Sequence, residues 1–393
     1  MIVPDSMACE GTNRKIFAPY MKSVLWEILF AKGGECVEQF YCKTKILTGD
    51  AAEILKQMEI KKLLLVTDPY FFEAGVAQKL AAQAERSEIF RDVTPDPSVE
   101  LAAKGTAVVR ELEPDTVVAL GGGSAMDCAK AMAYFYEKPV TLVAIPTTSG
   151  SGSEVTDFAV LAHGSSKYPL VDSKMRPDVA ILDKGLLEKL PKSLIADAGF
   201  DVLSHALEAY VATDAGAITD ALAKEAFCVA FDRLPASFAG DTRVRLQVHS
   251  ASAMAGMAFT QAGLGVCHAI AHSLGGMFHV PHGRLNAILL PAVVELNASG
   301  CGEKYAQIAR AAGLGGAADT LAVRNLKNGL CRLRRQLGLP QSLQQAGVDV
   351  RQLRYRMPDI VKTALADPCC ATNPVPVTEN GVRQILEEVT GRG

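Results

Sequence analysis

Apolar runs alternate with stretches of helical period over the first half of the chain, from Tyr41 to about Leu182. In chain order these patterns predict a strand at 63–67, a helix from about 74, a strand at 116–120, a helix over 126–134 and a strand at 141–145. Strands that alternate with helices are typical of a parallel sheet with crossover helices on both faces. We therefore expect an α/β domain in this half.

The strand pattern ends at about Lys184, and Ala-, Leu- and Met-rich stretches of helical period continue to Val389. The second half is therefore expected to be helical. A chain of 393 residues also favours two domains, because single hydrophobic cores stop growing at roughly 250 to 300 residues. We expect the α/β domain to occupy 39–186 and the helical domain 187–393.

The first 38 residues differ from the rest and read as an extension. One short segment, Met21–Lys32, has apolar residues at helical spacing and is followed by the pair Gly33-Gly34. We expect this segment to be an amphipathic docking helix. The alternatives are an unstructured tail and an overlong start, with the native initiator at Met7 or Met21.

The charge and the cysteine content of the chain restrict the classes of partner that it can bind. The 40 basic and 43 acidic side chains are interspersed and give a net charge of −3, which argues against nucleic acid and against a polybasic membrane surface. No apolar run reaches the roughly 18 residues of a membrane-spanning helix. The ten cysteines show no CxxC spacing and no hydrophobic leader opens the chain, so we expect a cytoplasmic protein with reduced thiols. Small molecules and copies of the chain itself are the expected partners.

Histidines gather in one part of the helical half. Four of the seven fall within a window of 15 residues, namely His268, His272, His279 and His282. Residues four apart share a helix face, so His268 and His272 can point into one cavity, and Asp201 and His205 can hold one ion together. Imidazole with carboxylate suits Zn²⁺ or Fe²⁺ without the thiolates of a closed structural site. A single histidine is more often a core residue, but the cluster predicts a metal site.

Two segments that follow strands have the composition of a nucleotide site. The run 116–120 ends in Gly121-Gly122-Gly123-Ser124 and passes into a helix expected to begin near Ala125. Glycines allow backbone amides to approach a pyrophosphate, and the helix N-terminus attracts its charge. The alternative is a plain tight turn.

The segment 146–154 follows the next strand and is rich in hydroxyl and small residues that could line a cofactor channel. A flexible loop with a helix cap would have the same composition. Asp68 ends the strand LLLVTD, where a carboxylate can accept hydrogen bonds from a ribose and repel a 2′-phosphate. Taken alone, Asp68 is more often a turn residue.

Together, the segments GGGSAMDCAKA, AIPTTSGSGSEVT, DVLSH and CHAIAH…PHG resemble the iron-containing (group III) alcohol dehydrogenase family from about Tyr41 to Thr390. The resemblance implies a Rossmann-like, NAD-binding α/β domain with a parallel sheet and an all-α, metal-binding C-terminal domain, the dehydroquinate synthase-like architecture. Within the family, TPDPSVE, KYPL and QAGLGVCHAIAHSLGG are most similar to the 1-propanol dehydrogenases of propanediol-utilisation microcompartments, and next to ethanolamine-pathway alcohol dehydrogenases.

The resemblance also implies roles for individual residues. The implied metal ligands are Asp201, His205, His268 and His282. The implied NAD contacts are Gly122, Gly123 and Ser124 for the pyrophosphate, Asp68 for the adenosine ribose, and Thr147, Thr148 and Lys167. His272 is implied as a proton-relay residue near the nicotinamide, and His279 matches no ligand position. We also expect Phe259 to shape an apolar pocket for a short alkyl chain.

The implied activity is the NAD-dependent interconversion of a short-chain primary alcohol and its aldehyde, either 1-propanol and propanal or ethanol and acetaldehyde, which recycles NADH to NAD. Fe²⁺ is the expected metal and Zn²⁺ the other candidate. The expected assembly is a homodimer or larger homo-oligomer, and the docking segment would bring it to microcompartment shell or cargo proteins.

Three alternatives stay open. One is a glycerol- or diol-type dehydrogenase of the same family. The second is a dehydroquinate synthase-like lyase, for which the segment 199–283 has few basic residues. The third is a structural or cargo protein. Two departures from the family pattern are the short loop at 137–140, which should open one rim of the cofactor site, and the N-terminal extension.

Overall fold

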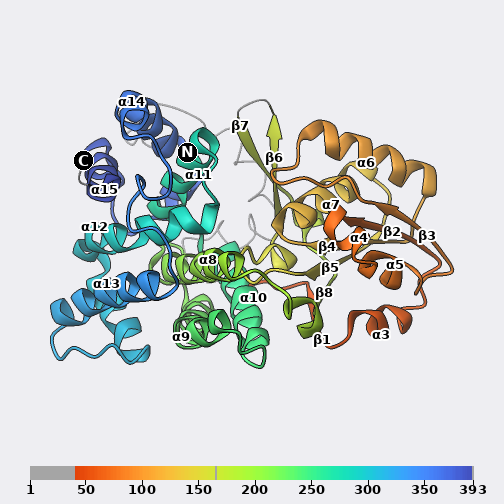
Figure 1. The fold of residues 1–393 in the computed structure, drawn as a ribbon, viewed down its shortest axis with the longest axis horizontal. Helices are drawn as coiled ribbons and strands as arrows, with labels where there is room; N and C mark the ends of the chain where they lie inside the picture. Colours follow the sequence, from red (N-terminus) through yellow and green to blue (C-terminus); the bar gives the residue numbers. More distant parts are fainter. Residues whose placement is uncertain (1–39, 164–165, 392–393) are drawn as a thin grey trace, which may run out of the picture. The chain divides into compact units, whose positions relative to one another are not determined.

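The computed structural model describes residues 40–163 and 166–391. The extension 1–38, with its expected docking helix, lies outside the described residues. Strands with their crossover helices make up the first half of the described chain, and helices make up the second half (Figure 1). The predicted α/β and helical halves are thereby confirmed.

A sheet of six parallel strands forms the centre of the first half. In spatial order the strands are β1 (Lys45–Thr48), β8 (Val179–Leu182), β5 (Thr141–Pro146), β4 (Thr116–Gly121), β2 (Lys62–Thr67) and β3 (Arg86–Phe90). Each neighbouring pair is parallel. The three predicted strands are β2, β4 and β5, which lie side by side at the centre.

Helices cover both faces of this sheet, as the alternating pattern predicts. On one face, α6 (Val99–Leu112) and α7 (Gly123–Tyr136) bury apolar residues against β2, β4 and β5. On the other face, α3 (Ala51–Lys56) and α5 (Val76–Ala81) pack against alternate residues of the same strands. Both faces of the central strands are therefore buried, which explains why the sequences of these strands are continuous apolar runs.

Two helix boundaries differ from the sequence prediction. The helix expected from about residue 74 is two short helices, α4 (Pro69–Glu73) and α5, because Gly75 between them has a φ of 75°. A left-handed residue ends a helix, and glycine adopts that conformation without a steric penalty. Helix α7 begins at Gly123, two residues before the expected Ala125, so the glycine run itself forms the helix N-terminus.

The chain forms an antiparallel hairpin between β5 and β8. The sequence analysis did not predict this hairpin. It consists of β6 (Phe158–His163) and β7 (Ser166–Val171). Lys167, an implied NAD contact, lies on β7, where its backbone pairs with Ala162. Its side chain lies outside the described part of the structure.

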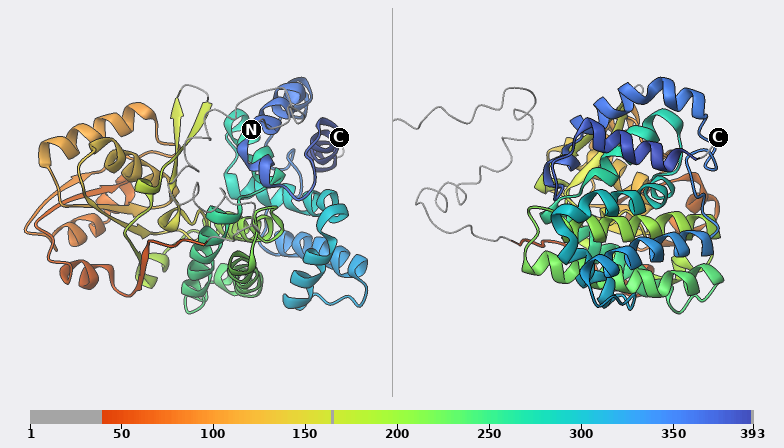
Figure 2. Two further views of the ribbon diagram at one scale, coloured as in Figure 1. Left: turned by 180° about the vertical axis from the view of Figure 1, so that it is seen from behind. Right: turned by 90° about the vertical axis from the view of Figure 1, so that its left-hand side faces the viewer.

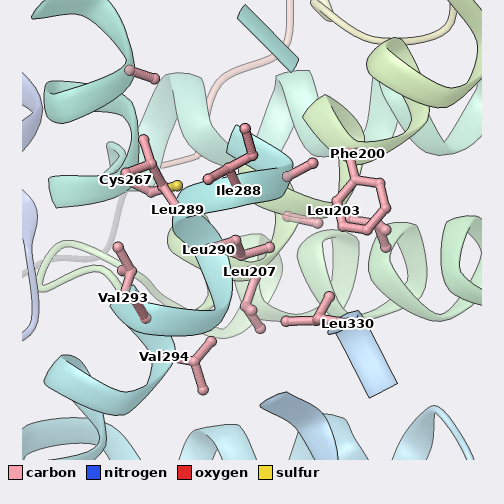
Figure 3. Close-up of a cluster of buried hydrophobic side chains, with 14 of the residues drawn as sticks. Phe200, Leu203, Leu207, Cys267, Ile288, Leu289, Leu290, Val293, Val294 and Leu330 are labelled. Carbon is pink, nitrogen blue, oxygen red and sulfur yellow. The ribbon is translucent and has the colours of Figure 1, made fainter. Parts of the chain in front are cut away.

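The second half is an array of helices: α8 (Lys192–Val211), α9 (Ala217–Ala239), α10 (Arg245–Ala262), α11 (Val266–Phe278), α12 (His282–Ala311), α13 (Asp319–Gln336), α14 (Val350–Ala366) and α15 (Glu379–Thr390). Between 184 and 391 the described chain has no strand. One large apolar core joins these helices. Figure 3 shows its centre, where Leu207 of α8 lies beside Leu290 of α12. Both views of Figure 2 show the same helical array.

Helix α12 is the one described helix that is long and apolar enough to cross a membrane by composition, with a mean hydropathy of 1.2. However, 61% of that apolar window is buried inside the protein. Burial in the helical core therefore accounts for its composition without a membrane.

The carboxyl ends of the central strands define a site. After β2 the chain runs to β3 on one side, and β4 then pairs with β2 on the other side, so the strand order reverses between them. Ligands of open α/β sheets bind at such a reversal, beyond the carboxyl ends of the strands. Asp68 follows β2, Gly122 follows β4 and Thr147 follows β5 at this edge.

Candidate metal and nucleotide site

Helix α8 carries two of the expected metal ligands. It is buried along most of its length, and its period places Asp201 and His205 on one buried face. Arg284 at the start of α12 donates two hydrogen bonds to Asp197, one turn before Asp201. A Cβ at Gly283 would lie 2.0 Å from the Asp197 carbonyl oxygen, so only glycine permits this close approach of α12 to α8.

Helices α11 and α12 contribute the other two ligands. α11 carries His268, and α12 begins at His282 after His279 has ended α11 in the left-handed conformation, with φ 54°. One ligand atom from each of Asp201, His205, His268 and His282 lies within 4.8 Å of all the others. The structure therefore brings together the four residues that the resemblance implies, and leaves the exposed His279 outside.

The protonation states of these residues suit a cation. Burial holds the pKa of His268 well below its ordinary value and lowers that of His282 to about 3, so both rings are neutral at pH 7. Burial opposes the ionisation of Asp201, but its interactions with the adjacent histidines and the hydrogen bond from Asn286 together keep its pKa below the ordinary value. One carboxylate with neutral imidazoles is a donor set for Fe²⁺ or Zn²⁺.

Hydrogen bonds from outside the cluster orient three of the four donors. The Gly150 carbonyl accepts from Nδ1 of His205 at 3.2 Å, and Glu208 accepts from Nδ1 of His268 at 2.5 Å. A carbonyl or carboxylate acceptor places the proton on Nδ1, which leaves the Nε2 lone pair for a metal. Asn286 donates from Nδ2 to Oδ1 of Asp201 at 2.8 Å. The Gly150 contact joins the metal cluster to the loop after β5.

The cluster is open on one side. The side chain of His268 is 1% exposed, whereas those of His282 and His272 are 37% and 40% exposed. The His272 ring stacks on the His282 ring, with centroids 5.2 Å apart. A substrate can therefore reach the cluster past His272 and His282.

His272 forms a second hydrogen-bonded pair. Its Nδ1 lies 2.9 Å from Oδ2 of Asp367, a residue between α14 and the 3₁₀ helix Pro368–Thr372. His272, Asp367 and Cys369 also offer three donor atoms within 4.8 Å of one another. Because Asp367 accepts from Nδ1, Nε2 of His272 remains available for proton exchange.

Phe259 and two further histidines have other surroundings. Phe259 is 4% exposed and stacks on the His205 ring with centroids 4.5 Å apart, so it is closely packed against an expected metal ligand. His249, which had no expected role, is buried with its Nδ1 2.9 Å from Oγ of Ser149. His163 is exposed and pairs with Glu100.

The nucleotide residues meet at the carboxyl edge of the sheet. Gly122 caps α7 without any side-chain hydrogen bond, and Gly123 and Ser124 begin the first turn, so the amides of these two residues of a 14-residue helix can bind an anion. A Cβ at Gly122 would approach Oγ1 of Thr148 to 3.3 Å. Thr147 is buried, and its amide donates to the Gly121 carbonyl.

Asp68 lies at the same edge. One of its oxygens caps α4 by accepting from the Phe71 amide, and the other lies 3.8 Å from where a Cβ on Gly121 would be. The loops that carry Asp68, the glycines and the two threonines therefore adjoin one another. Free helix amides beside glycines, with a carboxylate one strand away, fit the phosphates and ribose of NAD.

Sequence reasoning missed three residues that contact the site: Glu208, Asn286 and Asp367. Glu208 follows His205 by three residues and Asn286 follows His282 by four, so helical spacing could have indicated both. Asp367 is separated from His272 by 95 residues and carried no local signal.

Comparison with known proteins agrees with this geometry. Residues 43–184 match the family model for iron-containing alcohol dehydrogenase, and 195–390 match the C-terminal model of the same family. The chain is 41% identical to 1-propanol dehydrogenase PduQ of Citrobacter freundii, over 90% of this chain and 100% of that protein. It is 38% identical to the NADPH-dependent butanol dehydrogenase of Clostridium saccharobutylicum, over 81% and 85% of the two chains.

Among solved structures, sulfoacetaldehyde reductase from Bifidobacterium kashiwanohense, determined with NAD⁺, superposes with a TM-score of 0.83 at 27% identity, over 91% of this chain and 100% of that one. The family models together span both halves of the chain, including the glycine run and the four donors. The chain belongs to the iron-containing alcohol dehydrogenase family and is an NAD-dependent oxidoreductase that interconverts an alcohol and an aldehyde.

Proposed function

We propose that this enzyme interconverts propanal and 1-propanol, with acetaldehyde and ethanol as the nearest alternative pair, and that its usual direction oxidises NADH. One observation carries the chemistry: a buried carboxylate and three imidazoles converge within 4.8 Å beside the loop that follows β5. The similarity to a 1-propanol dehydrogenase over the whole of that protein supports the substrate.

Asp201, His205, His268 and His282 would hold the metal. When bound by these donors, a divalent cation would supply Lewis acidity towards the substrate oxygen. The four residues carry one negative charge in total when the imidazoles are neutral, so the loaded site keeps a formal charge of +1. That charge stabilises negative charge on the substrate oxygen in the transition state.

His272 would exchange the proton. Its ring lies against His282 at the open side of the cluster, and Asp367 fixes its orientation through Nδ1. Nε2 can then pass a proton between the substrate oxygen and water. Positioned general acids and bases contribute about 10²- to 10⁴-fold to the rate.

The α/β domain, 39–186, would bind NAD and the helical domain, 187–393, the metal. Gly122, Gly123 and Ser124 would hold the pyrophosphate, with Thr147, Thr148 and Lys167 as further contacts. Asp68 would accept from the adenosine ribose hydroxyls, and its charge would repel the 2′-phosphate of NADP. Replacing Asp68 by Ala is therefore expected to narrow the preference for NADH over NADPH, measured as the ratio of kcat/KM values.

Initial rates of NADH oxidation with propanal, acetaldehyde, glyceraldehyde and dihydroxyacetone test the function. We expect the highest kcat/KM for propanal. A higher value for a glycerol-derived carbonyl would favour a glycerol- or diol-type dehydrogenase, and the absence of NADH oxidation with every aldehyde would contradict the proposal.

His272→Ala tests the proton-relay role, since it is expected to lower kcat by about 100-fold while metal content stays unchanged. His279→Ala is the matched control on the same helix, because His279 is exposed at the C-terminal cap and lies outside the cluster. Equal turnover in both variants would remove His272 from the mechanism.

We also propose that the enzyme forms a homodimer or larger homo-oligomer in the cytoplasm, and that residues 21–32 direct it to a microcompartment shell. The similarity to PduQ and the helical spacing of Val24, Leu25, Ile28 and Leu29 support this. Deletion of residues 1–34 should abolish co-localisation with shell proteins and leave kcat unchanged. Unchanged co-localisation would refute the targeting role.

A further inference from the structure

Glu208 is a buried carboxylate next to the metal cluster. It lies on α8, three residues after His205 and seven after Asp201, and its spacing puts all three on one helix face. The residue is 2% exposed. A carboxylate buried this deeply is costly unless its oxygens are hydrogen-bonded.

Both Glu208 oxygens accept hydrogen bonds from the first turn of α11. Oε1 accepts from the Cys267 amide at 2.7 Å, and Oε2 lies 2.5 Å from Nδ1 of His268. The approach is close, because a Cβ at Gly265 would lie 2.7 Å from Oε1. Glu208 therefore caps α11 and contacts a metal-ligand imidazole at the same time.

The contact determines which nitrogen of His268 carries the proton. When Glu208 is ionised it accepts and cannot donate, so Nδ1 of His268 then bears the hydrogen and Nε2 bears the lone pair. The surroundings of Nε2 agree: the Asn286 amide group lies 3.3 Å from it, and Oδ1 of Asp201 lies 3.9 Å away. Nε2 therefore points at the other donors.

We propose that Glu208 is a positioning residue of the metal site, which fixes the His268 tautomer and adds a negative charge behind that ligand, so that divalent cations bind more tightly. This inference rests on His268 being a metal ligand. Carboxylates behind ligand histidines raise ligand basicity, and their loss typically lowers metal affinity by about 10- to 100-fold.

Glu208→Gln tests the proposal with almost no change of shape. A glutamine has one acceptor and one donor group where the site needs two acceptors. If its oxygen serves the Cys267 amide, its NH₂ faces Nδ1 of His268 and moves the imidazole proton to Nε2, which then cannot bind a metal. The reverse orientation places the NH₂ against the Cys267 amide.

Asn373 provides a matched control. Its Oδ1 accepts from the Val266 amide at 3.1 Å, so it caps the same turn of α11 but contacts none of the four ligand side chains. Asn373→Ala removes this cap together with the hydrogen bonds that Asn373 makes to Asn297 and the Val375 carbonyl, and it leaves the ligand side chains and Glu208 unchanged. Any effect of Glu208 that comes only from capping α11 must therefore also follow from Asn373→Ala.

The measurement is zinc retention by the zinc-loaded full-length enzyme against increasing concentrations of a chelator of known affinity. We expect Glu208→Gln to bind zinc about 10- to 100-fold more weakly, Glu208→Asp to recover part of the loss, and Asn373→Ala to lower the melting temperature while zinc affinity stays within about 2-fold of the wild type.

Wild-type affinity in Glu208→Gln, or an equal loss in Asn373→Ala, would overturn the proposal. If Glu208→Gln does not fold, Glu208→Asp tests the proposal in its place. The proposal then requires Glu208→Asp to bind zinc more weakly than Asn373→Ala does. A His268→Ala enzyme with unchanged zinc affinity would instead show that the ligand set is wrong, which distinguishes the two failures.

Discussion

The two halves of the molecule each bury a cluster of titratable side chains, and the two clusters differ in how their polar atoms are hydrogen-bonded. In the α/β half, Lys130 is 1% exposed, and its Nζ donates to Oγ of Ser153, Oγ1 of Thr156 and the Phe158 carbonyl, at 2.8 to 2.9 Å. Ser153 in turn donates to Asp127. All three ammonium hydrogens are used.

The cluster around Asp201 in the helical half is paired differently. One amide group, Nδ2 of Asn286, lies within 3.3 Å of acceptor atoms on Asp201, His268 and His282. Two amide hydrogens cannot satisfy three acceptors. Lone pairs of several acceptors therefore converge on one point, and a cation bound there would compensate them.

This difference indicates that the Lys130 cluster stabilises the fold, whereas the Asp201 cluster is proposed to bind a ligand. Lys130 links α7, whose N-terminus is the proposed pyrophosphate site, to the segment after β5, and its hydrogen bonds are complete without any ligand. In the Asp201 cluster, by our proposal, a cation would compensate the convergent acceptors. We therefore expect substitutions in the Lys130 cluster to change the stability of the fold, and substitutions in the Asp201 cluster to change metal binding.

The largest effect is expected from His268→Ala. Zinc sites with four protein ligands bind with about 10 to 16 kcal/mol, so one donor contributes about 2.5 to 4 kcal/mol, or roughly 70- to 900-fold in affinity. Turnover should fall to background. Metal content measured after dialysis against a weak chelator checks this, and unchanged content would remove His268 from the ligand set.

Lys130→Met should instead destabilise the fold by about 3 to 5 kcal/mol, because it leaves Asp127 and two hydroxyls buried without their cation. Metal stoichiometry in the folded fraction should stay as in the wild type. Urea unfolding with metal analysis of the same samples tests both points. Loss of metal without loss of stability would reverse our assignment of the two clusters.

Glu154 is the exception within the Lys130 cluster, since its buried Oε1 has no hydrogen-bond partner in the described part of the structure. Burial raises its pKa to about 7, while the charge of Lys130 opposes this. The folded protein then holds a proton that the unfolded chain releases, so this contribution to stability is present below pH 4.5 and is lost as the pH rises to about 7.

Glu154→Gln should remove that loss. We expect its unfolding free energy, relative to the wild type, to rise by about 3 kcal/mol between pH 4.5 and 7, since each pKa unit corresponds to about 1.4 kcal/mol. Denaturant unfolding at several pH values in this window measures it. Parallel curves for the two proteins would show that Glu154 does not titrate in the folded state as proposed.

An exposed ion pair is expected to give the smallest change in stability of the substitutions compared. Arg383 donates to Glu379 one turn earlier on α15, and both side chains are partly in solvent. Arg383→Gln should cost only about 0.3 to 0.5 kcal/mol, and less at high salt. A cost near that of Lys130→Met would mean that burial is not what distinguishes the Lys130 cluster.

Local periodicity was sufficient for the elements that carry the site. The runs at 63–67, 116–120 and 141–145 predicted the central strands because both faces of these strands are buried. The spacing of Asp201 and His205 predicted a shared helix face, which α8 provides. The hairpin β6–β7 was not predicted, because the pair makes a separate two-stranded sheet beside the main one.

Contacts between residues far apart in the chain could not be predicted from the spacing of residues in the sequence. Asp367 reaches His272, and the Gly150 carbonyl reaches His205, only because the tertiary fold joins segments 95 and 55 residues apart. His279 and His282 look alike in sequence, but one ends α11 and the other begins α12, so only His282 faces the cluster. The resemblance to the family separated these two histidines where periodicity did not.

X-ray absorption spectroscopy of the zinc-loaded enzyme tests the central claim most directly. Our account predicts a shell of nitrogen and oxygen scatterers at about 2.0 to 2.2 Å, with the outer-shell signature of three imidazoles and no sulfur. A zinc–sulfur distance of about 2.3 Å would place the ion at a thiolate such as Cys369, beside His272 and Asp367, and would contradict the assignment of Asp201, His205, His268 and His282 as the metal site.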